Sequence, residues 1–308
     1  MYPASTRSEN RVKQFEDLHD STNWAIIQHD GWHLPGTFEQ HDWCGKWAYR
    51  GCLNVAGHFH NETFRGMGYL KTFQRSCFRA DCEICMPKWM GRSSNKATRR
   101  IETYEKQSHR KVKHIVVSVP KWDYGLTKKE QSKKAYEVLK SLQCVGGAII
   151  YHPFRYDRPL KEWYYSPHFH VLGFGWITGV AENYNKNGYF VKNLGTRDST
   201  FSTFYYQLSH AGIKKRNHSL VWFGDLSYSK LKVENFDNDG MKCPICEEKL
   251  HELVLIGDIS HKPPDTDIEL AVDVDDFAIV KYERDEEDER EDYNPRLEIM
   301  KQILNETF

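Results

Sequence analysis

One ten-residue stretch, from Ser166 to Gly175, constrains the fold of this chain most strongly. It reads Ser-Pro-His-Phe-His-Val-Leu-Gly-Phe-Gly, with two histidines two residues apart and an apolar run after them. Side chains on a β-strand alternate between its faces, so His168 and His170 are expected to point the same way. Two imidazoles side by side on a rigid strand are suited to hold part of a divalent-cation site. Taken alone, however, such a pair is more often a surface or core feature.

The residues before this stretch predict a strand, a helix and a second strand. His114–Val119 is a β-branched run. Thr127–Gln143 carries apolar residues at helical spacing, and Gly146-Gly147 is expected to end that helix. Ala148–His152 reads as a strand that pairs antiparallel with the His168 strand, and this pairing brings His152 into range as a third metal ligand.

The connection between Pro153, which is expected to halt the second strand, and Ser166 is basic and aromatic. It is predicted to be a loop that grips DNA, with Arg155 and Arg158 as the contacting cations.

A helix is predicted after a short strand at residues 189–193, with Asp198 or Ser199 as its N-cap. Tyr206 falls off the apolar stripe of this helix, on a polar side where His210 follows one turn later. Tyr206 is therefore the tyrosine free to react, and Tyr205 is the packing tyrosine and the alternative nucleophile. The stripe consists of Phe201, Phe204, Tyr205 and Leu208, and residues 220–223 form a last strand.

The eight cysteines are interpreted as metal ligands rather than disulfides, because the N-terminus lacks the apolar core of a signal peptide and the protein is expected to be intracellular. The Cys82-x2-Cys85 spacing suits one structural zinc ion, with Cys77 as a third ligand. The fourth ligand is left open, in the order of preference Cys52, His58 and Cys44.

Cys243-x2-Cys246 is a second thiolate pair of the zinc-knuckle type. His210 or His218 could complete it, or Cys44 and Cys52 could. If His210 binds zinc, it is not available to assist Tyr206.

The zero net charge hides a division between a basic body and an acidic end. Residues 262–308 hold 16 acidic and 6 basic residues, which leaves 37 basic and 27 acidic residues in 1–261. The basic body suggests a polyanionic partner, and the acidic tail is either a solubilising extension or a mimic of nucleic acid. The helix that ends near Gln107 carries four cations expected on one face, which is either a solvated face or a contact surface for DNA phosphates. They are Arg92, Lys96, Arg99 and Arg100. No apolar run is long enough for a membrane span.

The ordered set resembles the three motifs of the HUH endonucleases, on residues 44–250. These are a β-branched strand, a strand with Pro-His-Phe-His-Val-Leu-Gly, and a helix with Tyr-Gln-Leu-Ser-His-Ala-Gly. More closely, the chain looks like the single-tyrosine rolling-circle replication initiators of archaeal plasmids and viruses, in which a Cys-rich zinc region precedes the catalytic domain. The resemblance implies an α+β fold, a ferredoxin-like or RRM-like antiparallel sheet with helices. The expected domains are a zinc region at 1–108, the HUH domain at 109–236, a CxxC segment at 237–261 and an acidic tail at 262–308.

The resemblance also implies roles for the site residues. His168 and His170 look like the metal ligands and Tyr206 looks like the nucleophile, while His152 stands where a third ligand is expected. His210 takes a place where a lysine or second tyrosine often stands. The implied reaction is nicking and rejoining of single-stranded origin DNA through a 5′-phosphotyrosine, with Mn²⁺ or Mg²⁺ as catalytic metal. The sequence has no Gly-x4-Gly-Lys-Ser/Thr loop, so a host helicase and polymerase are expected partners.

Three other functions remain open from the sequence. A transposase of the same superfamily would use the same active site on different DNA. A non-catalytic zinc-containing DNA-binding protein would keep the histidines as packing groups. A metal-dependent hydrolase would need acidic ligands near the histidine strand, where the sequence offers only Asp157 and Glu162.

Overall fold

The computed structural model describes residues 23–38, 40–234, 241–256 and 263–280. They belong to two compact units, the first formed by residues up to 46 and 74–237, the second by 47–73 and the residues from 238 on. The predicted segment 109–236 lies within the first unit. Along the sequence, residues 47–73 of the second unit are inserted between two segments of the first, because strands distant in sequence pair in the second unit. The predicted segments, in contrast, followed one another.

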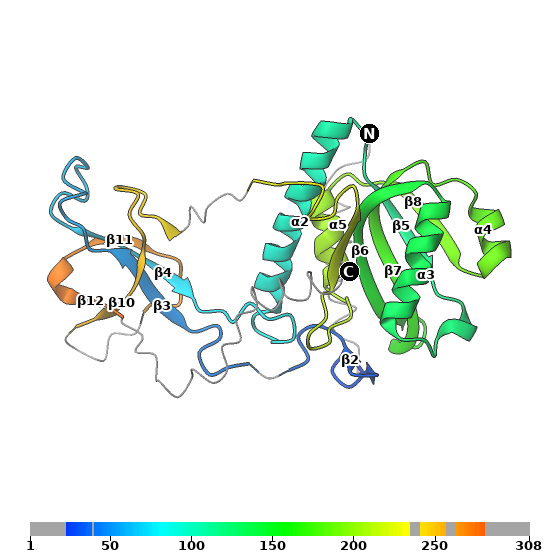
Figure 1. Cartoon of the computed structure of the whole chain (residues 1–308). Helices are drawn as coiled ribbons and strands as arrows, with labels where there is room; N and C mark the ends of the chain where they lie inside the picture. Colours follow the sequence, from blue (N-terminus) through cyan, green and yellow to red (C-terminus); the bar gives the residue numbers. More distant parts are fainter. Residues whose placement is uncertain (1–22, 39, 235–240, 257–262, 281–308) are drawn as a thin grey trace, which may run out of the picture. The chain divides into compact units, whose positions relative to one another are not determined.

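The first unit is built on a five-stranded antiparallel sheet of order β8-β5-β7-β6-β9 (Figure 1). The α+β class with an antiparallel sheet is confirmed. The long strands β6 and β7 pair at its centre and carry the histidines. The strands are β5 (Lys113–Ser118), β6 (Cys144–Asp157), β7 (Glu162–Gly175), β8 (Phe190–Thr196) and β9 (Leu220–Gly224), and a two-stranded ribbon, β1 (Gln28–His29) and β2 (Trp32–His33), precedes them.

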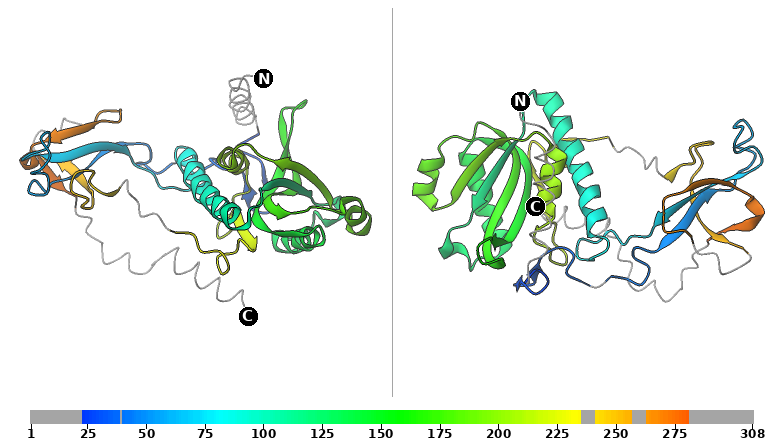
Figure 2. Two further views of the ribbon diagram at one scale, coloured as in Figure 1. Left: turned by 90° about the horizontal axis from the view of Figure 1, so that it is seen from above. Right: turned by 180° about the vertical axis from the view of Figure 1, so that it is seen from behind.

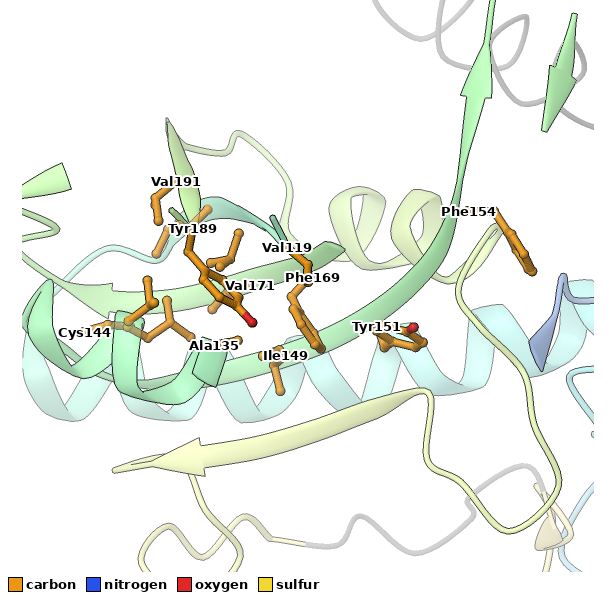
Figure 3. Close-up of a cluster of buried hydrophobic side chains, with 14 of the residues drawn as sticks. Val119, Ala135, Cys144, Ile149, Tyr151, Phe154, Phe169, Val171, Tyr189 and Val191 are labelled. Atoms are coloured by element: carbon orange, nitrogen blue, oxygen red, sulfur yellow. The ribbon is translucent and has the colours of Figure 1, made fainter. Parts of the chain in front are cut away.

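Helix α3 (Lys128–Ser141) covers one face of this sheet. Thr127 caps it by accepting a hydrogen bond from the Glu130 amide, and the Glu130 carboxylate accepts one from the Thr127 amide. Apolar side chains of α3 pack on those of the sheet, in a cluster that Figure 3 shows around Phe169 and Val171. Helix α4 (Val180–Asn187) leads into β8, and a short 3-10 turn (Lys121–Asp123) precedes α3.

Helices α2 (Met86–Ser108) and α5 (Thr200–Leu208) pack together against the opposite face (Figure 2). Their buried side chains meet Ile150 of β6 and Leu172 of β7. Directly opposed residues in an antiparallel pair share a face, and His170 is opposite Ile150. The histidines therefore lie on the α2 and α5 side.

Two expectations for the centre of the chain were wrong. Pro153 does not halt the second strand, because a register shift between His152 and Phe154 accommodates it and β6 continues to Asp157. The expected loop is thus mostly paired backbone of the β6–β7 hairpin. Gly146 and Gly147 do not end the helix either, since they lie within β6, where neighbouring backbone approaches closely.

The second unit holds a separate sheet of order β11-β4-β3-β10-β12. Its strands are β3 (Trp47–Cys52), β4 (Gly68–Gln74), β10 (His251–Leu255), β11 (Glu269–Val272) and β12 (Phe277–Ile279), with a 3-10 turn (Val274–Asp276) before β12. Two of these strands, β11 and β12, fall in the predicted tail 262–308, so the described part of that segment contributes to a sheet. Residues 281–308, which hold 15 of its 22 charged residues, lie outside the described residues.

Among the described helices, none combines the length and the apolar character that a membrane crossing needs.

Gly147→Ala is expected to lower the free energy of unfolding by about 1–3 kcal/mol, because a Cβ there would collide with the carbonyl oxygen of Leu172. Gly91→Ala in α2 is the control, because its Cβ would meet nothing within 4 Å. This variant is expected to gain up to about 1 kcal/mol from helix propensity. Urea unfolding measures both, and equal effects would contradict the close approach of β6 and β7.

Candidate metal centres and tyrosine site

His168 and His170 project from the central strand β7 onto one face of the sheet. His168 is buried, and its Nδ1 donates a hydrogen bond to the Ser166 carbonyl oxygen at 2.9 Å. This bond fixes the tautomer and leaves the lone pair of Nε2 available to a metal ion.

His152 joins the pair from the neighbouring strand β6, where it is directly opposite His168. Its ring centroid lies 5.2 Å from that of His168 and 4.4 Å from that of His170. One ligand atom from each imidazole falls within 4.8 Å of the others. His152 is fully buried, and both of its ring nitrogens lack a hydrogen-bond partner among the described residues. Because an unpaired buried polar group is costly, this orphaned imidazole fits a site that holds a metal ion. These three residues are called the histidine triad below.

Burial lowers the pKa of each triad imidazole well below its usual value of 6.5. The cationic Arg155 adds to this effect, as do the neighbouring imidazoles around His152 and His170. All three side chains are therefore neutral at pH 7, which is the protonation state that binds a metal.

Two residues behind the triad were not predicted from the sequence, His114 on β5 and Arg197 after β8. His114 Nε2 lies 2.8 Å from His170 Nδ1, and Arg197 donates to His114 Nδ1 at 2.9 Å. Burial, together with Arg197, lowers the pKa of His114 to about 4. With Nδ1 accepting from Arg197, the neutral His114 ring carries its proton on Nε2, which faces His170 Nδ1. Strand periodicity could have indicated it, because His114 shares a face with Val116, which is opposite His170.

The two tyrosines of α5 point to different sides, as their helical spacing predicted. Tyr205 packs on the cluster between α2 and the sheet, and Tyr206 on the cluster that contains Trp163. Ser199 caps the helix by accepting a bond from the Ser202 amide. Burial raises the pKa of the Tyr206 phenol, and Arg158 opposes this rise. Tyr206 therefore needs a base or cation to ionise near neutral pH.

His210 connects Tyr206 to the triad. Its ring centroid lies 5.0 Å from that of Tyr206 and 4.5 Å from that of His152. The structure thus places His210 beside the tyrosine rather than in a cysteine cluster. Its Nδ1 lies 3.1 Å from the Ser209 hydroxyl.

The first cysteine cluster consists of Cys44, Cys77, Cys82 and Cys85, whose four sulfur atoms lie within 4.8 Å of one another. The predicted trio is confirmed as a group, but its fourth member is Cys44, the least preferred candidate. Burial acts to raise the Cys85 pKa, but hydrogen bonds from Ser76 and the Cys77 amide outweigh it and lower this pKa to about 7. The Cys85 thiol therefore ionises near neutral pH to the thiolate, which is the form that binds zinc.

The second cluster consists of Cys52, His58, Cys243 and Cys246. His58 Nδ1 bonds the Met67 carbonyl, and its Nε2 lies 3.2 Å from Cys243 Sγ. Cys52 and His58 were preferred for the first cluster, and His210 or His218 for this one. His210 and His218 are not in the cluster, and of the alternative pair Cys44 and Cys52 only Cys52 is. The pairing of β3 with β10 brings the end of β3 to the Cys243 turn. Four thiolates, or three thiolates with one imidazole, are ligand sets typical of structural zinc.

The expected DNA-contacting cations divide into two groups. Arg92, Lys96 and Arg99 are exposed on α2, and Arg158 is exposed near the turn of the β6–β7 hairpin. Arg100 was wrongly included, since it is buried and donates to the carbonyl oxygens of Leu226, Ser227 and Leu231. Arg155 is half-buried and donates to Ser118 Oγ at 2.8 Å, close to the triad.

No protein-family model, curated protein or solved structure matches this chain.

Cys82→Ser and Cys243→Ser are each expected to remove one zinc ion relative to the wild type, because each breaks one four-ligand set. Cys144→Ser is the control, since this buried cysteine belongs to neither cluster. Native mass spectrometry of protein purified with zinc counts the ions. Loss of zinc in the Cys144 variant, or none in the other two, would contradict the assignment.

The triad is expected to destabilise the fold as the pH falls below about 6.5. The folded-state pKa of His152 lies below its unfolded value, so the unfolded chain binds the extra proton and gains stability in acid. The loss is at most about 1.4 kcal/mol per pH unit for each histidine. Urea unfolding at pH 7.5 and 5.5 should show a smaller drop in His152→Gln than in the wild type. The zinc clusters are shared by both proteins, so their acid sensitivity cancels, and equal drops would contradict the buried neutral imidazole.

Proposed function

We propose that the chain is a metal-dependent endonuclease of the HUH type, which nicks and rejoins single-stranded DNA to initiate rolling-circle replication. The observation that supports this proposal most strongly is that the histidine triad, His210 and Tyr206 lie next to one another in that order. The triad lies on adjacent strands of an antiparallel sheet. Helix α5, which packs on the same face, carries Tyr206, and His210 lies between Tyr206 and His152.

The triad would hold the catalytic ion, which polarises a phosphate oxygen when bound. Three imidazoles are soft ligands for Mg²⁺, so we expect Mn²⁺ to support the reaction at least as well. Neutral imidazoles add no negative charge to the site, and Arg155 adds a cation beside it. This electrostatic balance favours the approach of an anionic phosphodiester.

In the proposed reaction the Tyr206 oxygen attacks the phosphorus, and the bond from phosphorus to the 3′ oxygen breaks. The phenol proton leaves toward a base, for which His210 is the adjacent imidazole. The 3′ oxygen takes up a proton and departs as a free 3′-OH for a polymerase to extend. The phosphotyrosine bond conserves energy for rejoining, so no nucleotide triphosphate is needed.

The two cysteine clusters would serve this function structurally. Cys82 and Cys85 lie at the start of α2, whose later turns pack on the sheet beside α5. Zinc at the first cluster would therefore stabilise the helix that supports the tyrosine helix. The exposed cations of α2 would contact DNA phosphates, and a host helicase would supply unwinding.

The test is a search for covalent adducts in a pool of random single-stranded oligonucleotides with added Mn²⁺. Wild-type protein should form an SDS-stable adduct, and mass spectrometry should find a 5′-phosphate on Tyr206. Tyr206→Phe should abolish the adduct because it lacks the nucleophilic oxygen, whereas Tyr205→Phe should keep it.

Loss of the adduct only in Tyr205→Phe would keep the enzyme class and reverse the roles of the two tyrosines. Absence of any adduct, with single-strand binding intact, would favour a non-catalytic zinc-containing DNA-binding protein.

A further inference from the structure

A continuous row of side chains crosses the triad-bearing face of the sheet. Phe190 on β8 is directly opposite Ser118 on β5, Ser118 is opposite His168 on β7, and His168 is opposite His152 on β6. Opposed residues of antiparallel strands share a face, so all four point to the same side. Strands lie about 4.8 Å apart, which puts the Phe190 backbone about 10 Å from that of His168.

Within the part of the chain that the structure describes, the face is covered over its β6–β7 half and at His114 of β5, and is open over the rest of its β5–β8 half. Ile150 and Leu172 are buried beneath α2 and α5. Val116 and Ser118 of β5 are instead partly exposed, and Lys192 of β8 is exposed. Lys192 is opposite Val116, so it belongs to the same face.

The open half presents aromatic rings to solvent. Phe190 is 55% exposed, and Tyr184 on α4 is 50% exposed. Their rings meet edge to face, with the ring centroids 6.4 Å apart. A single exposed aromatic residue is ordinary, but a pair beside a candidate metal site indicates a surface that is covered during function.

The charge around these rings is complementary to a polyanion. Lys192 is two residues after Phe190 on β8 and therefore lies on the same face. Arg155 reaches Ser118 of the same row through a 2.8 Å hydrogen bond to Ser118 Oγ. Cations on an open sheet next to an aromatic ring are the elements of a single-strand binding platform, in which bases stack and phosphates pair with the cations. A duplex hides its base faces, so these rings favour an unpaired strand.

We propose that the β5–β8 half of the triad-bearing face binds the single-stranded DNA next to the scissile phosphate, with Phe190 stacked on a base and Lys192 and Arg155 against phosphates. This inference rests on the proposed endonuclease function and names where its substrate lies. In this proposal β8, an edge strand that carries no triad residue, binds the substrate so that the scissile phosphate lies at the metal site.

The first experiment measures binding of a fluorescein-labelled single-stranded oligonucleotide to the full-length protein by anisotropy. All proteins carry Tyr206→Phe and receive no added Mn²⁺, so that cleavage does not intervene. Phe190→Ala should weaken binding about 5- to 150-fold, which is the usual effect of removing one stacking ring. Phe190→Trp should retain affinity, and a matched duplex should bind Phe190→Ala as it binds the parent.

Trp176→Ala is the matched control, because Trp176 is 73% exposed and follows β7 at the end remote from His168. It should bind the single strand like the parent protein. Lys192→Gln should reduce the slope of log affinity against log salt by about 0.7, as expected for one lost phosphate contact on a single strand.

The outcomes separate this inference from the function on which it rests. Unchanged single-strand affinity in Phe190→Ala, with adduct formation by the wild type, would overturn the platform and keep the endonuclease. A specific loss in Phe190→Ala without any adduct in the wild type would keep the platform as a single-strand site. Equal losses in Phe190→Ala and Trp176→Ala, or a loss confined to single-stranded RNA, would also overturn it.

Discussion

The antiparallel pairing of β6 with β7 is the constraint on which the candidate site depends. Its register sets His152 opposite His168, and a shift by one residue would turn one of them to the opposite face. The close approach at Gly147 fits this register, which is continuous from Gly146 to His152 and shifts at Pro153. The pairing also buries the imidazoles, and burial is what keeps them neutral and available to a metal ion.

The helices on the triad side then decide which tyrosine can take part. Helix α5 packs its Phe204 side into the core with α2, and this contact turns Tyr206 toward His210. Arg100 belongs to the same packing, because its bonds to three backbone carbonyls hold the chain after β9 against α2. The cysteine clusters lie around this arrangement, one at the start of α2 and one within the second unit.

Much of the site followed from local sequence, because strand alternation and helical spacing have short periods. These rules predicted the His168 and His170 face, the His152 pairing and the divergence of the two tyrosines. They failed where tertiary pairing decides. The order of preference among Cys52, His58 and Cys44 for the first cluster was wrong, because only the β3–β10 pairing determines which cluster Cys52 reaches. Arg100 was misassigned because charge alone does not reveal a buried guanidinium with carbonyl partners, and His114 was missed because its role depends on the β5–β7 register.

The central claim is that the histidine triad binds a divalent cation, and electron paramagnetic resonance of added Mn²⁺ tests it most directly. Zinc-loaded wild-type protein should remove the signal of one free Mn²⁺ ion per chain. His168→Ala and His170→Ala should lose this binding because each removes a ligand, whereas His60→Ala, at an exposed histidine outside the triad, should keep it. Wild-type protein that binds no Mn²⁺, or triad variants that bind it like the wild type, would contradict the account.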